Sequence, residues 1–152
     1  MVITFIGHSF VTSKDKVKEL VKNQVKNNID GVPNVSFYLG GYGDFDEICA
    51  QVCRELKKIY PAIELVYVSP YFNSSAQEKI KALLQGKLYD TSIYPPIENS
   101  PPKFAILKRN EWMVTNADLI VSYIDHNYGG AYKSIQIAKR HRKKIINICD
   151  FL

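Results

Sequence analysis

KRNEWMVTNADLIVSYIDHNYGGAYKSIQIAK, residues 108–139, decides the fold, because it runs through a helix, a buried strand and a second helix in turn. Residues 104–115 are predicted to be helical, and Asp118 precedes the strand LIVSYI at 119–124. This strand is apolar enough to be buried on both of its faces. A glycine turn then opens a helix predicted from Gly129 to His141. A strand between two helices is the repeating unit of a parallel sheet.

The rest of the chain continues this alternation. The other predicted strands are Val2–Ile6, Val35–Leu39, Leu65–Val68 and Lys144–Ile148, with a short one at Thr91–Tyr94. Further helices are predicted after Ser13 or Asp15, either of which can cap the first turn, from Asp44 to Ile59, and over Ser74–Gln85. We therefore predict a single domain over residues 1–152, an α/β protein with a Rossmann-like three-layer α/β/α architecture and a mostly parallel sheet.

Residues 86–103 are rich in proline and show no clear period, so we expect a loop around the short strand. Loops of this length inside a compact domain usually have a function. This loop and its tyrosines are our candidate for a lid or a subunit contact.

The composition indicates a soluble globular protein, with 46% hydrophobic residues and a net charge of +5. No run of 18 apolar residues is present and the N-terminal segment does not resemble a signal peptide, which predicts a cytoplasmic protein without a membrane span. Cys49 and Cys53 on a helix and Cys149 on a strand are interpreted as buried thiols rather than disulfides or metal ligands. The positive charge favours an anionic partner only weakly.

Two basic runs supply much of the charge. The first, Lys14 to Lys26, has helical spacing and is interpreted as a solvated helix face. The second, KRHRKK at Lys139 to Lys144, closes a helix, where cations meet the negative end of the helix dipole. A nucleic-acid patch is the alternative interpretation of this second run.

Three glycine-containing turns each follow a strand and precede a helix. They are Gly7-His8-Ser9, Gly40-Gly41-Tyr42-Gly43 and Tyr128-Gly129-Gly130-Ala131. In an open α/β sheet the carboxyl ends of the strands meet at one edge, where ligands bind. Glycine lets the backbone approach a phosphate closely, and the start of a helix attracts anions. These turns predict one binding site for a nucleotide-like ligand, although no dinucleotide fingerprint and no P-loop is present, and no cofactor is expected.

Three polar residues near these turns, Asp46, Arg109 and Asn110, are candidate ligand contacts. Asp46 can accept a hydrogen bond from a ribose or a base, or it can simply stabilise a helix start, with Asp44 as the expected N-cap. Arg109, with Asn110 beside it, can grip a phosphate, with a surface ion pair as the alternative. Trp112 and Met113 are expected in the core.

His8 and His126 both lie beside strand-end turns. Each can bind a phosphate, act as a general acid or serve as a structural hydrogen-bonding group. We assign no catalytic residue and no metal ligand.

The motifs FIGH, FYLGGYGDFDEICA, PPKFAI, KRNEWMVTNADLIVSYIDHNYGGAYKSIQIAK and KIINI resemble a small bacterial and phage family of the SLOG superfamily. The most specific parts are GGYGDFD and RNEWMV…AD…YGGA. The superfamily includes lonely-guy phosphoribohydrolases, DNA-processing recombination mediators and ligand-sensing domains of phage-defence proteins. The resemblance implies a Rossmann-like fold, a nucleotide-type ligand at the glycine turns and a homo-oligomer.

Two departures from the superfamily pattern bear on function. Gln136 stands where the lonely-guy motif has a glutamate. Glu47 does have the motif's spacing between glycine and glutamate, but it follows the earlier glycine turn. The second departure is Ser9, which stands where relatives often have an arginine. Glutamine cannot ionise to stabilise a developing positive charge. The leading hypothesis is therefore non-catalytic binding, as a sensor or a sequestering protein, of a nucleotide-derived molecule such as an ADP-ribose-like or cyclic nucleotide signal. A nucleotide N-glycosidase or phosphoribohydrolase and a single-stranded DNA-binding protein are the alternatives.

Overall fold

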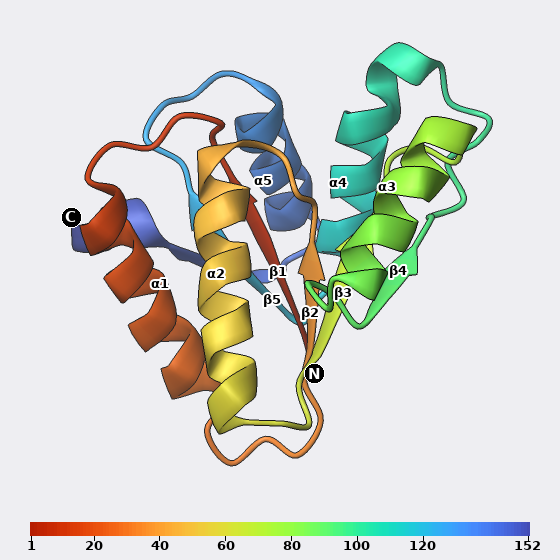
Figure 1. Ribbon diagram of the computed structural model, residues 1–152. Helices are drawn as coiled ribbons and strands as arrows, with labels where there is room; N and C mark the ends of the chain where they lie inside the picture. Colours follow the sequence, from red (N-terminus) through yellow and green to blue (C-terminus); the bar gives the residue numbers. More distant parts are fainter.

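A six-stranded parallel sheet lies at the centre of the molecule, and the computed structural model describes residues 1–152 (Figure 1). The strands are β1 (Val2–Gly7), β2 (Ser36–Leu39), β3 (Glu64–Val68), β4 (Thr91–Ile93), β5 (Leu119–Tyr123) and β6 (Lys144–Asn147). Their order across the sheet is β4-β3-β2-β1-β5-β6, and every neighbouring pair is parallel. The predicted Rossmann-like α/β fold is confirmed, and so is the short strand inside the proline-rich loop.

Five α-helices cover the two faces of the sheet. They are α1 (Lys14–Ile29), α2 (Gly43–Ile59), α3 (Ser74–Gln85), α4 (Ala105–Thr115) and α5 (Gly130–Arg140), with short 3₁₀ helices at Pro102–Phe104 and Ile148–Phe151. Helices α1, α2 and α3 pack on one face, and α4 and α5 on the other (Figure 1). This is the expected three-layer arrangement.

The larger hydrophobic core lies between the sheet and α1 to α3. One side of α1, formed by Val17, Val21, Val25 and Ile29, is buried, because residues four apart lie on the same side of a helix. Burial of each aliphatic side chain stabilises the fold by roughly 1.5–3 kcal/mol, so this stripe anchors α1 on the sheet. A smaller core under α4 and α5 buries the second face.

The chain changes direction across the sheet once. From β1 it proceeds outward through β2 and β3 to β4, and α4 then carries it back to β5 on the other side of β1. The connections after β1 and after β5 therefore leave the sheet on opposite faces. A crevice opens between the carboxyl ends of two such strands, and in open α/β sheets ligands bind in this crevice.

Some local predictions are wrong. Neither Ser13 nor Asp15 caps α1: Ser13 precedes the helix in a left-handed conformation without a side-chain hydrogen bond to it, and Asp15 lies inside the first turn. Cys149 lies in a 3₁₀ helix, because the Asn147 side chain ends β6 by accepting hydrogen bonds from the backbone N–H groups of Cys149 and Ile124.

The predictions for other buried residues are mostly confirmed. Cys49 and Cys53 are free, buried thiols, and Cys149 is a partly buried one. Met113 is buried as expected, whereas Trp112 is only half-buried and stacks on Tyr38 with the ring centroids 5.5 Å apart.

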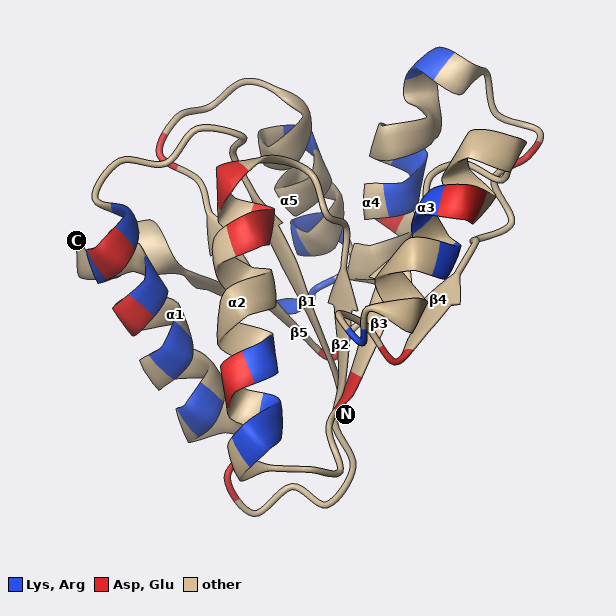
Figure 2. Cartoon of the chain, in the orientation of Figure 1, with Lys and Arg blue, Asp and Glu red and all other residues tan.

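Positive charge is spread over the helices rather than gathered at one place (Figure 2). The lysines of α1 lie on its exposed side, which confirms the interpretation of Lys14 to Lys26 as a solvated face. The KRHRKK run lies where α5 ends and β6 begins, at the amino ends of the strands. None of the helices combines the length and apolar character that a membrane crossing requires.

Replacing Gly43 by alanine should destabilise the fold more than replacing Gly31 does. Both glycines have positive φ angles, of 88° and 76°, so each alanine should cost about 1–2 kcal/mol in backbone strain. A Cβ atom on Gly43 would also lie 2.6 Å from the Cα atom of Ser9, whereas the space around Gly31 is open. Urea denaturation should show an additional loss of about 1–3 kcal/mol for Gly43→Ala. Equal losses would contradict the close packing of these turns.

Candidate functional site

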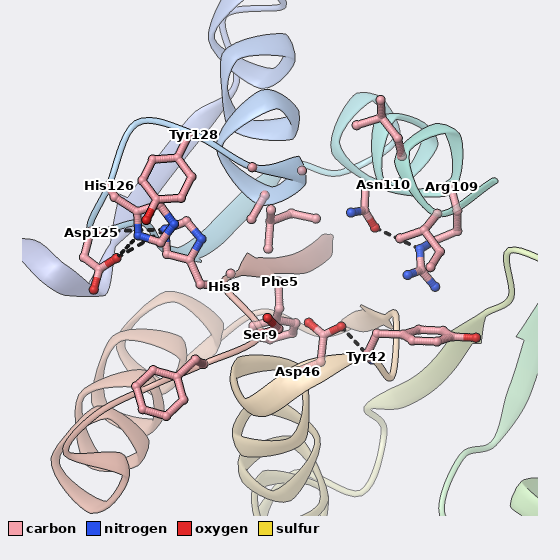
Figure 3. A pocket seen from close by; sticks show the side chains of 18 residues that line it. Phe5, His8, Ser9, Tyr42, Asp46, Arg109, Asn110, Asp125, His126 and Tyr128 are labelled. Atoms are coloured by element: carbon pink, nitrogen blue, oxygen red, sulfur yellow. Dashed lines mark hydrogen bonds and ion pairs between the residues drawn. The ribbon is translucent and has the colours of Figure 1, made fainter. Parts of the chain in front are cut away.

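A cavity of about 750 Å³ lies in the crevice at the carboxyl ends of β1 and β5 (Figure 3). Its walls come from the turns after β1, β2 and β5 and from the first turns of α4. The sequence-predicted residues that line it are Gly7, His8, Ser9, Tyr42, Asp46, Arg109, Asn110, His126, Tyr128, Gly129, Gly130 and Ala131. The structure thus brings residues from four separate segments of the chain into one space.

Gly40, Gly41 and Gly43 do not line this cavity. A Cβ atom on Gly40 would meet the Arg109 guanidinium at 3.0 Å, and one on Gly41 would meet the Tyr67 ring at 2.7 Å. A Cβ atom on Gly43 would likewise meet Ser9. The three glycines therefore allow the second turn to pack closely against its neighbouring residues. At the third turn the space around Gly129 and Gly130 is open. The open glycine turn at the start of α5 is therefore the one whose backbone a ligand can approach.

Arg109 lies at the centre of the site and is 1% exposed. Its Nη1 atom donates hydrogen bonds to the carbonyl oxygens of Gly40, at 2.9 Å, and Val68, at 2.7 Å, and Nε donates to Asn110 Oδ1 at 2.9 Å. The third nitrogen, Nη2, has no hydrogen-bond partner in the protein. Burial lowers the pKa of Arg109, but a guanidinium stays charged at neutral pH.

This environment decides between the two interpretations of Arg109. No carboxylate lies within ion-pair distance of its guanidinium, so the surface ion pair is wrong and the arginine faces the cavity. A buried cation with free N–H groups directed into a cavity is suited to bind an anion such as phosphate.

Asp46, rather than the expected Asp44, accepts the hydrogen bond at the start of α2. Asp44 does not cap α2, which begins at Gly43; its Oδ2 atom instead accepts a hydrogen bond from the Val11 N–H at 3.0 Å. Asp46 Oδ2 accepts from the backbone N–H of Tyr42 at 2.9 Å and so serves the helix start. Its other oxygen, Oδ1, has no partner.

Asp46 is also the most strongly perturbed carboxyl group of the site. Burial raises its pKa to about 6, against the opposing effects of the Tyr42 N–H and the Arg109 charge. The group therefore exchanges its proton close to neutral pH. It can accept a hydrogen bond from a ligand when ionised and donate one when protonated.

His8, His126 and Tyr128 form a stack of three rings along one wall (Figure 3). The two imidazoles are nearly parallel with centroids 3.5 Å apart, and the Tyr128 ring lies 4.1 Å from that of His126. Burial, with the nearby His126, lowers the pKa of His8, so its ring is neutral at pH 7. His8 Nε2 accepts a hydrogen bond from the Asp125 N–H at 3.3 Å, and His126 Nδ1 lies 2.6 Å from Asp125 Oδ1.

His8, Asp125 and His126 also have the composition of a metal site, which the sequence did not suggest. One ligand atom from each residue lies within 4.8 Å of the others. Imidazole binds metals through a lone pair in the plane of its ring, however, and the two rings here lie in parallel planes. One ion cannot lie in both planes unless a ring rotates, so we interpret the group as a hydrogen-bonded stack.

Six lining residues were missed by the sequence analysis. They are Phe5, Ile6, Phe10, Ile106, Leu107 and Asp125. The helical spacing of Ile106 from Arg109 and the position of Phe10 directly after Ser9 were available signals. Asp125 is next to His126, but its contact with His8 joins residues far apart in the chain.

All exposed aromatic side chains of the protein lie on the carboxyl side of the sheet. They are Phe10, Tyr42, Phe72, Phe104, Tyr128 and Phe151, in segments that follow strands or precede α4. Tyr128 and Phe10, at the cavity, are the most exposed, at 68% and 73%. The carboxyl edge is therefore the side of the sheet where aromatic rings are available for a ligand to contact.

Comparison with known proteins shows similarity in fold only. No protein-family model and no curated protein sequence matches the chain. It is similar to the structure of DNA processing protein A from Helicobacter pylori, described for its single-stranded DNA binding mode, with 17% identity and a TM-score of 0.60 over 95% of this chain and 63% of that one. DNA processing protein A from Streptococcus pneumoniae gives 12% identity and a TM-score of 0.59 over 94% and 48%.

These matches show that the two proteins share the Rossmann-like α/β fold of this chain. The chain spans 63% and 48% of the lengths of the two proteins, so it corresponds to only part of each.

Ionisation of Asp46 should make the fold less stable. Its pKa in the folded protein, about 6, lies above the ordinary aspartate value of 3.8, so the folded state holds the proton more tightly between these values. The free energy of unfolding should therefore fall by about 2 kcal/mol as the pH rises from 4 to 7. The Asp46→Asn variant should not show this fall in the free energy of unfolding. Urea denaturation of the wild type and the variant at a series of pH values measures the difference. An unchanged pH dependence in the variant would contradict the assignment.

Proposed function

We propose that the carboxyl edge of the sheet binds single-stranded DNA, with the cavity at Arg109 holding the phosphate and base of one nucleotide. One observation carries the proposal: a buried guanidinium with a free nitrogen lines the same cavity as Phe10 and Tyr128, the two most exposed aromatic side chains of the protein. Proteins bind single strands by combining cationic contacts to the backbone with aromatic platforms for the bases.

The phosphate is assigned to the space between Arg109 and the start of α5. Arg109 is the only lysine or arginine that lines the cavity. Gly129, Gly130 and Ala131 line the same cavity, and the first N–H groups of a helix have no partners within it. Guanidinium and helix start would bind one phosphate from two sides.

The base is assigned to the ring stack. Tyr128 is exposed, and its ring is supported from behind by His126 and His8. Asp46 Oδ1 and the Nδ2 group of Asn110 have no partners in the protein and supply an acceptor and a donor for a base edge or sugar. The cavity thus offers a phosphate contact, a stacking surface and polar groups together.

The fold comparisons support DNA as the source of this nucleotide, because the similar Helicobacter pylori protein binds single-stranded DNA. The net charge of +5 favours approach of a polyanion. Because Ser9 provides no guanidinium, we assign the main phosphate contact of the cavity to Arg109.

A free nucleotide-derived small molecule is the second candidate, as in the hypothesis of an ADP-ribose-like or cyclic nucleotide signal. The cavity volume of about 750 Å³ favours it, since small-molecule sites occupy roughly 300–1,000 Å³. Asp46 and Asp125 also favour a small molecule, because their negative charges would repel the successive phosphates of a nucleic-acid strand. Calorimetry with a nucleotide panel and with oligothymidine separates the two candidates, because a signalling ligand should bind far more tightly than the oligonucleotide.

The glycosidase alternative receives no support from the positions of the expected carboxylates. Glu47 lies outside the cavity, and its side chain accepts a hydrogen bond from Gln51. Gln136 lines a different, smaller cavity beside Tyr132. We therefore do not extend the proposal to catalysis.

Tyr128→Ala should weaken the binding of a fluorescein-labelled thymidine oligonucleotide, measured by fluorescence anisotropy. Loss of one stacked base costs about 1–3 kcal/mol, which is roughly 5- to 150-fold in affinity. Phe151→Ala is the matched control, because Phe151 is an exposed aromatic on the same side of the sheet but does not line the cavity. Equal losses in the two variants, or no binding by the wild type, would argue against the proposal.

Neutralising the basic run should have a smaller effect than changing Arg109. Arg140 and Arg142 lie at the end of α5, at the opposite edge of the sheet from the cavity. Arg140→Gln with Arg142→Gln should reduce affinity less than about tenfold, by long-range charge alone. Arg109→Gln should reduce it more than tenfold.

The same anisotropy titrations, with melting temperatures as a check on folding, decide between the two surfaces. The reverse order of effects in folded variants would assign DNA binding to the KRHRKK run instead of the cavity.

A further inference from the structure

A second cavity, of about 330 Å³, lies at the carboxyl end of β3 beside the start of α3. Its lining consists of Tyr42, Tyr67, Ser69, Tyr71, Asn73, Ser75, Ala76 and Lys79. Tyr42 is the only residue that also lines the cavity at Arg109. Figure 3 shows its ring beside Arg109, directed away from His8 and His126. The two cavities are therefore neighbours with one aromatic ring between them.

Cations lie close to the ring of Tyr42 in both cavities. Arg109 Cζ lies 5.4 Å from its centroid, and Lys79 Nζ lies 4.9 Å from it. Lys79 is the only charged residue of the second cavity and forms no ion pair with a carboxylate. Its ammonium group is thus held over the rings of Tyr42 and Tyr67 and keeps its donors free.

The second cavity also contains hydroxyl groups without partners. Tyr67 is only 2% exposed, yet its hydroxyl makes no hydrogen bond, and the hydroxyls of Tyr42 and Tyr71 make none either. A buried tyrosine hydroxyl usually finds a partner in the protein. Burial raises the pKa of Tyr42 and Tyr67, so both keep their protons and can donate.

Ser69 and Asn73 differ from these tyrosines, because their side chains already bond to the backbone of Tyr71 and Ala76. The unpartnered groups of this cavity are therefore an ammonium, three phenols, the Ser75 hydroxyl and the Nδ2 group of Asn73. All six can donate a hydrogen bond, which suits a phosphate.

We propose that this second cavity binds the next phosphate of the same nucleic-acid strand, with Lys79 and the Tyr67 hydroxyl as its donors and Tyr42 between two successive nucleotides. The inference rests on the proposed binding of the first nucleotide at Arg109. It makes the site at least two nucleotides long and gives the strand a path from α5 past Arg109 and Tyr42 to α3.

The dependence of affinity on ligand length tests this inference. Dissociation constants are measured by calorimetry for thymidine 5′-monophosphate and for the 5′-phosphorylated thymidine dinucleotide at one salt concentration. Wild-type protein should bind the dinucleotide about tenfold more tightly, because of the second phosphate contact. Lys79→Gln and Tyr67→Phe should each remove most of this gain and leave the affinity for the mononucleotide within twofold.

Lys81→Gln is the matched control, because Lys81 is an exposed lysine of α3 that does not line the cavity, and the gain should persist in this variant. Equal affinities of the wild type for the two ligands, or a gain that survives in both Lys79→Gln and Tyr67→Phe, would overturn the second site while leaving the first in place. Absence of binding of either ligand would overturn the proposed function together with this inference.

Discussion

The hydrogen bonds from Arg109 to the carbonyl oxygens of Gly40 and Val68 are the contacts on which the site depends. They tie α4, the helix that carries the chain from β4 back to β5, to the carboxyl ends of β2 and β3. A buried cation needs such partners, because its desolvation costs several kcal/mol. With Nη1 and Nε bonded to the protein, Nη2 is the guanidinium nitrogen that remains available to a ligand.

The charge of Arg109 organises the groups around it. It partly offsets the effect of burial on the pKa of Asp46, and this carboxyl group in turn holds the start of α2 through the Tyr42 N–H. Tyr42 then lies between Arg109 and Lys79. Asp46 and the Tyr42 ring are therefore both held beside the Arg109 guanidinium, at the boundary between the two cavities.

The sequence predicts the fold and much of the site for clear physical reasons. Apolar strands alternating with amphipathic helices indicate a parallel sheet, and parallel strands bring their carboxyl ends to one edge, which places Gly7, His126 and Gly129 together. Other features depend on contacts between distant segments. The steric roles of Gly41 and Gly43 require Tyr67 and Ser9 as neighbours, the His8–His126 stack joins β1 to β5, and the choice between Asp44 and Asp46 depends on Val11. Spacing along the chain carries no signal for these contacts.

Binding of a nucleic-acid phosphate by Arg109 can be observed in a crystal structure of the protein with a short 5′-phosphorylated thymidine oligonucleotide. We expect a phosphate oxygen within about 3 Å of Arg109 Nη2 and a base stacked on the ring of Tyr128. An oligonucleotide bound along the KRHRKK run, with none of its phosphates in the cavity, would show that Arg109 does not have this role.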